Sequence, residues 1–285
     1  MSHLLQLVQR IKTTDTIKKT TNAMRLISMS THTRLRQSKS NLDAYYQEIE
    51  RLRLCIQELG ESEDQGLQGF IPATGLPADQ EEKRELFIVI GSQKGLCGNF
   101  NETLGHIFLR EKRDFDSEIL VIGKQMRSFL LFQEIEPTIS YDEFGMRNLF
   151  TLANEITTLV RSSVYGSVTV FYTYPKSFFM HVPTLLELKR EDFIYQGPEE
   201  LDFEAIKEQS YKDTYDFLGY FALKSQIEKL LLDSLLAEAA ARFLSMDAAT
   251  RNADDLINVM RLDYNKLRQA TITRELSDLS ASFIL

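Results

Sequence analysis

The stretch GSQKGLCGNFN, residues 91–101, is the part of the sequence most like a binding loop. It follows a short apolar run and precedes a helix-like segment, which is where phosphate-binding loops stand in α/β proteins. A P-loop requires Gly-Lys followed by Ser or Thr, whereas Lys94 here precedes Gly95. A dinucleotide motif requires GxGxxG, whereas the glycines here are spaced GxxxGxxG. The pattern therefore predicts a turn or a surface contact rather than a nucleotide site.

The other side chains capable of chemistry are scattered along the chain. Cys97 has no neighbouring base that would activate its thiol, so we interpret it as a small packing residue. Neither it nor Cys55 belongs to a CxxC pair, which argues against a disulfide framework or a zinc site. The histidines lack the spacing of metal ligands: His3, His32, His106 and His181. With no nucleophile, base and orienting group together, the sequence predicts no catalytic residue, no metal and no cofactor.

The charge is unevenly distributed. The net charge is −8, yet residues 1–59 hold ten Lys or Arg and five Asp or Glu, and Asp15 is the only acid before Leu42. A basic arm can bind nucleic acid or an anionic membrane, but no aromatic residue precedes Tyr45 to stack on bases. We therefore expect a basic face that meets an acidic protein partner. We also expect a cytoplasmic-side protein, because neither a membrane span nor a signal peptide is evident.

Residues 2–59 contain neither Gly nor Pro and predict one unbroken helix of roughly 85 Å, at about 1.5 Å per residue. Every seventh residue from Leu7 falls on one stripe of this helix: Leu7, Thr14, Thr21, Ser28, Leu35, Leu42, Ile49 and Ile56. We expect the companion stripe three residues later: Arg10, Ile17, Met24, Thr31, Ser38, Tyr45, Leu52 and Leu59. The middle of this seam is small and hydroxylated, where Leu or Ile would give a more stable coiled coil.

The centre of the chain changes its hydrophobic period. Residues 60–84 are acidic and rich in Gly and Pro, which predicts a linker or loop. Beyond them, short apolar or β-branched runs predict strands at 85–91, 118–123, 166–175 and 179–189. Helix-like segments stand between them at 96–113, 124–133 and 146–165. This alternation predicts a small, largely parallel, Rossmann-like α/β domain at 85–198.

Residues 199–285 predict a second long helix, because no proline follows Pro198 and no glycine follows Gly219. Its seam alternates two sets, beginning with Leu232, Ala239, Met246, Ala253 and Met260 and with Leu236, Phe243, Thr250, Ile257 and Tyr264. We expect this helix to pair with residues 1–59 as a long antiparallel coiled coil around the inserted domain. Two helices packed separately on the insert are the alternative, but the insert is too small to cover both.

This layout resembles the gamma subunit of F-type ATP synthases, the central rotor shaft, over nearly the whole chain. The most specific part is SLLAEAAARFLSMDAATRNADDLINVMRLDYNKLRQATITRELSDL, which is similar to the family pattern SLxxExAARxxAMxxATxNAxxLIxxLxxxYNKxRQAxITxEL. GSQKGLCGNFN is similar to the family's SDxGLCGxxN. The opening stretch is similar to ITxAMxMVAASK at Thr21, Ala23, Met24 and Ser30.

The resemblance implies a rotor subunit without an active site. In that family the paired helices project into a ring of alternating alpha and beta subunits, and beta makes or hydrolyses ATP. The implied function is to couple ion flow through the membrane c-ring of a proton-translocating enzyme to that chemistry. The implied partners are the alpha, beta and epsilon subunits and the c-ring, with no nucleic acid, no cofactor and no direct small-molecule substrate. The implied location is peripheral, on the cytoplasmic face of a bacterial membrane.

The resemblance also implies roles for particular residues. Positions that match contacts with the moving loops of beta are Met24, Glu238, Arg242, Arg268, Gln269 and Thr273. Positions that match the foot loop near epsilon and the c-ring are Gly95, Leu96, Cys97 and Gly98. Helix packing or a solvated face is the alternative for each. We further expect small and hydroxylated residues on the outer surface of the shaft, where they would allow several shallow contacts with the ring.

Some residues depart from the family pattern. The chain is acidic overall, Asp247 replaces a usually basic residue, and Asn99 and Phe100 differ from the common pair. These departures favour no single enzyme variant, so a gamma-like subunit of a sodium-type F-ATPase is an alternative. A coiled-coil scaffold without a motor role and a small nucleotide-dependent enzyme built on the insert are the other two hypotheses.

Overall fold

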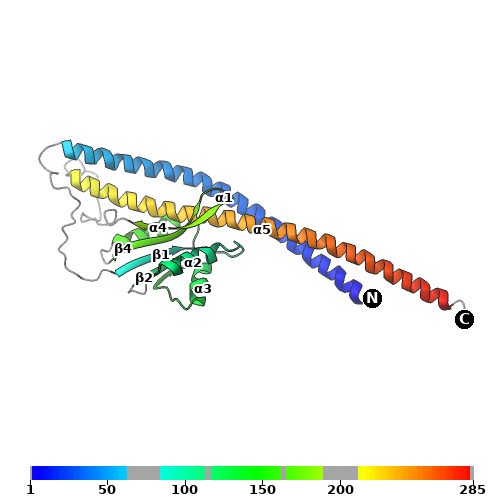
Figure 1. Cartoon of the computed structure of the whole chain (residues 1–285). Coiled ribbons are helices and arrows are strands. Elements are labelled where there is room, and N and C mark those ends of the chain that lie inside the picture. The colour runs from blue at the N-terminus through cyan, green and yellow to red at the C-terminus, as the bar shows by residue number, and fades with distance from the viewer. Residues whose placement is uncertain (1, 63–83, 113–116, 162–164, 189–210, 283–285) are drawn as a thin grey trace. The chain divides into compact units, whose positions relative to one another are not determined.

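The computed structural model describes residues 2–62, 84–112, 117–161, 165–188 and 211–282 (Figure 1). Most of the predicted linker at 60–84, and the predicted start of the second long helix at 199–210, lie outside these ranges. The chain divides into two compact units. The first unit comprises residues 1–30 and 242–285, and the second unit comprises residues 31–241. Among the described residues, no helix is long and apolar enough to cross a membrane.

The two long helices are present as predicted. Helix α1 runs from Ser2 to Ser62 and helix α5 from Tyr211 to Ser282. The predicted stripe from Leu7 faces inward on α1, since Ser28, Leu35 and Ile49 are buried and Leu7, Thr14, Thr21 and Leu42 are half-buried. Both predicted sets on α5 also face inward: Met246, Ala253, Ile257 and Met260 are buried, and Thr250, Tyr264 and Leu267 are half-buried.

The predicted companion stripe of α1 is wrong. Its members Ile17, Met24, Tyr45 and Leu52 are between 37% and 51% exposed. The buried or half-buried companions instead lie four residues after the first stripe: Ile11, Lys18, Arg25, His32, Lys39, Tyr46 and Arg53. The two choices differ by one residue, or about 100° around a helix. Most residues of the true stripe are basic, so a search for apolar periodicity selects the wrong one.

These basic residues are inward because acids on α5 pair with them. In the first unit, Lys18 Nζ lies 2.5 Å from Asp254 Oδ1 and Arg25 Nη1 lies 2.7 Å from Asp247 Oδ1. Between these pairs, the hydroxyls of Thr21 and Thr250 are hydrogen-bonded at 2.9 Å. Residue numbers rise along α1 as they fall along α5, so the helices are antiparallel within this unit.

The second unit repeats the arrangement. Lys39 pairs with Asp233, which is only 2% exposed, and Lys229 Nζ lies 3.3 Å from Asp43 Oδ1. In all four ion pairs of the two units the residue numbers add to 272, so the antiparallel pairing keeps one register. This register matters most for Lys39 and Asp233, whose charges would be costly to bury alone, whereas Lys18 and Asp254 stay 36% and 51% exposed.

One position of this charged series is neutral. His32 falls a heptad after Arg25 and a heptad before Lys39, and the register sets Ala240 opposite it. The imidazole is 8% exposed and packs edge-on against Phe178, with ring centroids 4.7 Å apart. Burial, together with the charge of Arg36, lowers the pKa of His32 below its ordinary value. The neutral ring is therefore favoured where an ion pair would otherwise stand.

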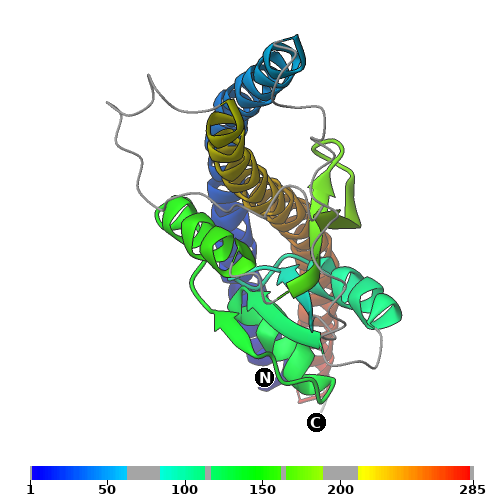
Figure 2. The same ribbon diagram turned by 90° about the vertical axis from the view of Figure 1, so that its left-hand side faces the viewer.

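The sheet of the second unit has five strands: β1 Arg84–Ile90, β2 Ser117–Ile122, β3 Ile139–Tyr141, β4 Tyr165–Pro175 and β5 His181–Leu188. Their order is β3-β2-β1-β4-β5. The first four are parallel, and β5 returns antiparallel to β4 as a hairpin, seen in yellow-green in Figure 2. Pro183 is tolerated in β5 because this strand lies at the edge of the sheet.

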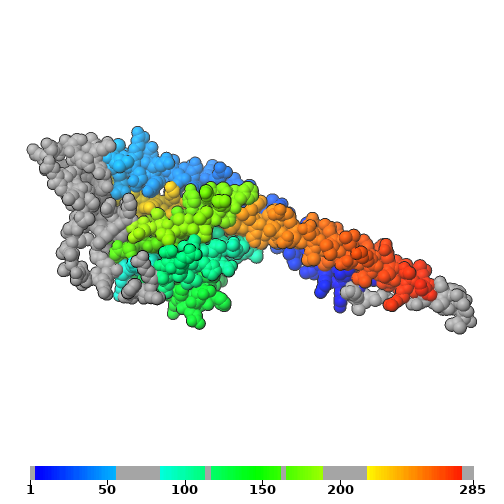
Figure 3. All heavy atoms as spheres, viewed as in Figure 1, coloured from blue at the N-terminus to red at the C-terminus, as the bar shows by residue number. Residues whose placement is uncertain are grey.

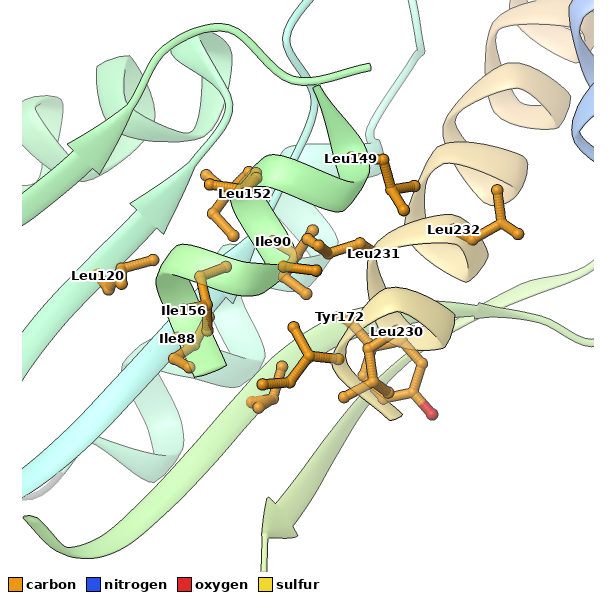
Figure 4. Packing of buried hydrophobic residues seen from close by; sticks show 14 of the residues in the cluster. Ile88, Ile90, Leu120, Leu149, Leu152, Ile156, Tyr172, Leu230, Leu231 and Leu232 are labelled. Carbon is orange, nitrogen blue, oxygen red and sulfur yellow. The ribbon is translucent and has the colours of Figure 1, made fainter. Parts of the chain in front are cut away.

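Three shorter helices cover the sheet: α2 Phe100–Glu111, α3 Lys124–Phe132 and α4 Leu149–Arg161. Helices α2 and α3 pack on one face, where Phe87 and Phe171 meet Phe108. Helices α4 and α5 pack on the other face (Figure 1). There Ile88 and Ile90 of β1 meet Ile156 of α4 and Leu231 of α5 in one continuous core (Figure 4).

The predicted strands and helices of the centre are present, with two corrections. Helix α2 begins at Phe100 rather than residue 96, because residues 96 and 98 have positive φ and cannot belong to a right-handed helix. Strand β3 was not predicted, since three residues are too short for a hydrophobic period.

Replacing Lys39 by Met should lower the free energy of unfolding by about 3–5 kcal/mol, because the Asp233 carboxylate would stay buried without its partner. The double change Lys39→Met with Asp233→Leu should recover most of this loss. Urea unfolding monitored by circular dichroism measures both. Lys19→Met is the control, since Lys19 pairs with Asp15 while 77% exposed, and it should cost less than about 1 kcal/mol. A double variant as unstable as Lys39→Met would contradict the ion-pair account.

Candidate functional site

The loop between β1 and α2 is shaped by a buried polar cluster of Ser92, Cys97 and Asn101. Asn101 Oδ1 accepts a hydrogen bond from the Ser92 amide at 2.9 Å, and Asn101 Nδ2 donates to Ser92 Oγ at 2.7 Å. Ser92 Oγ lies 3.5 Å from Cys97 Sγ. Gly91 is required beside this cluster, since a Cβ there would lie 2.3 Å from Met126 Cβ. The Gly, Ser, Cys and Asn of GSQKGLCGNFN are thus used to hold a loop.

This loop turns Cys97 inward and Leu96 outward. Cys97 is 4% exposed and packs with Phe100 against Ala237 and Ala241 of α5. Leu96 is 55% exposed and has a φ of 65°, a left-handed conformation that non-glycine residues seldom adopt. Such strain is held only where surrounding contacts impose it, and it is common at functional surfaces. The interpretation of Cys97 as a packing residue is confirmed.

The predicted foot loop lies against α5. Gly95 is half-buried and faces open space, and Gly98 is exposed with a φ of 62°. Ala237 and Ala241, which contact Cys97, flank Glu238 on the helix. Within the second unit, the predicted foot loop therefore packs on α5 beside Glu238, the one predicted beta contact that belongs to this unit.

The residues predicted to contact beta differ in their exposure. Arg268, Gln269 and Thr273 are exposed on α5 of the first unit. Met24 is 37% exposed on α1, and Arg242 is half-buried. Glu238 is only 5% exposed and belongs to the second unit. Exposed side chains are available to a partner as they stand, whereas Glu238 is enclosed by its own chain.

Sequence reasoning missed several large apolar residues that are exposed on the first unit. Leu26 and Ile27 of α1 are 58% and 65% exposed, and Leu256, Val259 and Leu262 of α5 are between 51% and 62% exposed. In the space-filling view the outer side of this part of α5, orange to red, is uncovered (Figure 3). Exposed large apolar residues are typical of surfaces that contact another protein when they lie in one patch. Their positions outside the helix seam are the signal that could have revealed them.

Small, hydroxylated residues of α1 occur both outside and inside: Thr13, Thr16 and Thr20 are exposed, whereas the hydroxylated members of the first stripe are not. Thr14 and Thr21 are half-buried and Ser28 is 4% exposed, so they line the inner seam rather than the outer surface. There the Thr21 hydroxyl bonds to Thr250, and Ser28 Oγ donates to the Met24 carbonyl at 2.8 Å. The reason is that the first stripe packs against the partner helix, which leaves the larger apolar residues outside.

The described residues contain no group of three or more His, Cys, Asp or Glu placed to hold a metal ion. Cys97 is hydrogen-bonded within a buried cluster that lacks a base, which does not make a nucleophile. Exposed apolar faces and an outward leucine on a constrained loop instead define a protein built for contacts with other chains.

Comparison with known proteins agrees with this class. A family model described as ATP synthase matches residues 3–283, so the chain belongs to the ATP synthase family. Its curated relatives include the ATP synthase gamma chain of Mycoplasmoides gallisepticum, which is 27% identical over 99% of both chains. The gamma chain of Clostridium acetobutylicum is 29% identical, with 97% of this chain and 95% of the relative covered.

Solved structures with the same fold come from mitochondrial ATP synthases. A chain of the Euglena gracilis OSCP/F1/c-ring complex has a TM-score of 0.53 at 19% identity, covering 89% of this chain and 94% of its own length. A chain of the Tetrahymena thermophila central stalk/c-ring structure has a TM-score of 0.51 at 17% identity, covering 80% and 98%. These similarities extend the fold, two long helices with a mixed central sheet, to proteins distant in sequence.

Replacing Asn101 by Ala should lower the free energy of unfolding by about 1–3 kcal/mol, because the amide of the fully buried Ser92 would lose its acceptor. Asn99→Ala is the matched control, since Asn99 is exposed and makes no side-chain capping hydrogen bond, and it should change stability by less than about 0.5 kcal/mol. In a Cys55→Ser background, Asn101→Ala should also speed the reaction of Cys97 with a thiol reagent. Unchanged stability and reactivity would refute the role of this cluster.

Proposed function

We propose that this chain is the central-stalk rotor subunit of a proton-translocating F-type ATP synthase. It couples ion flow through the membrane c-ring to ATP synthesis or hydrolysis on the beta subunits. It is a non-catalytic subunit, and the chemistry belongs to beta. The observation that carries the proposal is the family match from residue 3 to residue 283, supported by relatives named gamma chains along almost their full lengths.

The mechanical part of the proposal rests on the helix pair. We propose that α1 and α5 form an antiparallel coiled coil, supported by the inward stripes and by ion pairs of one register. Neither α1 up to residue 59 nor α5 after Gly219 contains Gly or Pro, which suits a stiff element. A stiff, asymmetric shaft that turns presents different faces to successive beta subunits and biases their conformations.

The proposed domains are a helix at 1–59, a linker at 60–84, a Rossmann-like domain at 85–198 and a helix at 199–285. Support for the Rossmann-like description comes from the parallel order β3-β2-β1-β4 with helices on both faces. Strand β5 is added antiparallel at the edge, as in many mixed sheets.

Contacts with the catalytic ring are proposed for Met24, Arg242, Arg268, Gln269 and Thr273. Exposure supports the contact for Arg268, Gln269, Thr273 and Met24. Burial does not support a direct contact for Glu238. The exposed apolar residues of the first unit add to the proposed surface, because burying them against a sleeve of partner subunits contributes about 25 cal/mol per Å².

The loop at Gly95–Gly98 is proposed to meet the epsilon subunit and the c-ring. Leu96 supports this proposal, since a strained backbone displays its apolar side chain outward while Cys97 anchors the loop to α5. The chain would then lie as a peripheral protein on the cytoplasmic face of the membrane. The alpha subunits complete its proposed partners, and a sodium-coupled enzyme is the alternative for the coupling ion.

Arg268→Ala combined with Gln269→Ala should weaken assembly with alpha and beta subunits, or uncouple ATPase activity, by roughly tenfold or more if each residue contributes about 1 kcal/mol. Both side chains are exposed, so the melting temperature of the isolated chain should stay unchanged. Arg274→Ala is the control, because Arg274 is also exposed on α5 but occupies a variable position of the family pattern. Normal assembly and turnover in the double variant would remove this site.

The purified chain alone should not bind ATP or NAD at micromolar concentrations in equilibrium dialysis. The glycines around Lys94 have neither nucleotide spacing, and Ser92 and Asn101 hold the loop in its own hydrogen bonds. Micromolar binding would favour a nucleotide-dependent enzyme. Failure to co-purify with alpha and beta subunits would favour a scaffold instead.

A further inference from the structure

The second unit contains a cleft of about 520 Å³ bounded by α1, α4 and α5. Its volume lies within the range of small-molecule sites, about 300–1,000 Å³. Tyr45 of α1, Phe150 of α4 and Phe221 of α5 contribute aromatic walls, and Met146 stands just before α4. Tyr45 and Phe150 are 48% and 58% exposed, so their apolar surface is available from outside.

Glu228 of α5 also lines this cleft and is the unusual member of its wall. It is only 5% exposed, yet within the described parts of the chain its carboxylate has no hydrogen bond or ion pair. Its neighbour Lys229, by contrast, pairs with Asp43 at 3.3 Å and lies over the ring of Tyr46. Although the side chain is largely buried, its carboxylate oxygens are not among the fully buried atoms that lack a partner, so they remain accessible at the cleft. A largely buried charge without a hydrogen-bond partner calls for an explanation.

One cation compensates this carboxylate only in part. Lys224, one turn earlier on α5, also lines the cleft and favours the charged form of Glu228, but the larger effect is burial, which raises the pKa of Glu228 above its ordinary value. The Ser225 hydroxyl donates to the Phe221 carbonyl at 2.7 Å and is already used. The negative charge of Glu228 in turn adds to burial in raising the pKa of the Tyr45 hydroxyl.

We propose that this cleft binds a small organic cation, an ammonium group on an aromatic or branched apolar body, with Glu228 as its counter-ion. One carboxylate suits an ammonium better than a divalent metal, because Ca²⁺ takes six to eight oxygen ligands. The aromatic walls suit the same ligand through contact with its body and through cation–π attraction. This proposal concerns a site apart from the rotor contacts and does not depend on them.

The test uses the full-length chain with methyl-labelled methionines and 2-phenylethylammonium as the probe. Met146 lines the cleft and should report binding as a saturable shift of its methyl signal. Met126, buried on the opposite face of the sheet, should stay unshifted. The neutral analogue 2-phenylethanol has the same body without the charge. No saturable shift of Met146 with the ammonium compound would overturn the proposal.

Glu228→Gln should lower the affinity for the ammonium compound at least about tenfold, as loss of one partner of a buried charge pair does. It should change the affinity for 2-phenylethanol less than about twofold. Glu111→Gln, which removes an exposed carboxylate on α2, is the matched control and should alter neither affinity. Equal binding of the ammonium compound to wild type and Glu228→Gln would overturn the assignment of Glu228.

The melting temperatures of wild type and variants, measured without any ligand, provide a second test. Glu228→Gln should raise the melting temperature by about 2 °C or more, since a largely buried charge that lacks a hydrogen-bond partner is removed. Glu111→Gln should leave it unchanged. A lower melting temperature for Glu228→Gln would mean that the carboxylate already has a stabilising partner, and it would overturn the proposal.

Discussion

The pairing of basic residues on α1 with acidic residues on α5 is the constraint from which much of this structure follows. Lys18, Arg25 and Lys39 occupy one heptad position, and their acids lie on α5 in one antiparallel register. An apolar seam tolerates sliding by a heptad at modest cost, whereas a slipped ion pair leaves a half-buried or buried charge alone. Polar pairs in a helix interface are well suited to set register in this way. Asp233, at 2% exposure, is where the constraint is strictest.

That register also decides which residues are left outside. With Thr14, Thr21 and Ser28 turned inward, the larger apolar residues Leu26 and Ile27 point away from the seam. A shaft with only small residues on its outer surface would have suggested weak contacts with the surrounding ring of partner subunits. The structure places the hydroxylated members of the first stripe between the helices, and its outer surface carries exposed threonines together with large apolar residues. The contacts of the first unit with partner subunits are therefore expected to bury apolar area. Comparable contact energies at different rotational positions of the shaft would then depend on the surfaces of the partner subunits as well.

The second unit joins the sheet to the same helix pair through two different contacts. One is the large core in which Ile90, Ile156 and Leu231 meet. The other is the small cluster of Cys97 and Phe100 with Ala237 and Ala241. The latter places the strained loop bearing Leu96 directly on α5. Because Cys97 and Phe100 of the loop pack on Ala237 and Ala241, a displacement of the loop would change the packing of α5 next to Glu238.

Sequence by itself determined the elements: two helices free of Gly and Pro, four of the five strands, the inward stripes of α5, and the likeness to ATP synthase gamma subunits. Periodicity suffices there because each pattern is contained in one local segment. Tertiary structure alone decided the second stripe of α1, the inward position of Thr21, the outward position of Leu96 and the isolation of Glu228. Each of these depends on a partner far along the chain: Lys18 is inward only because Asp254, 236 residues later, meets it. The local hydrophobic pattern does not include that distant acid, so it predicts an exposed position for a basic residue that the paired helices in fact enclose.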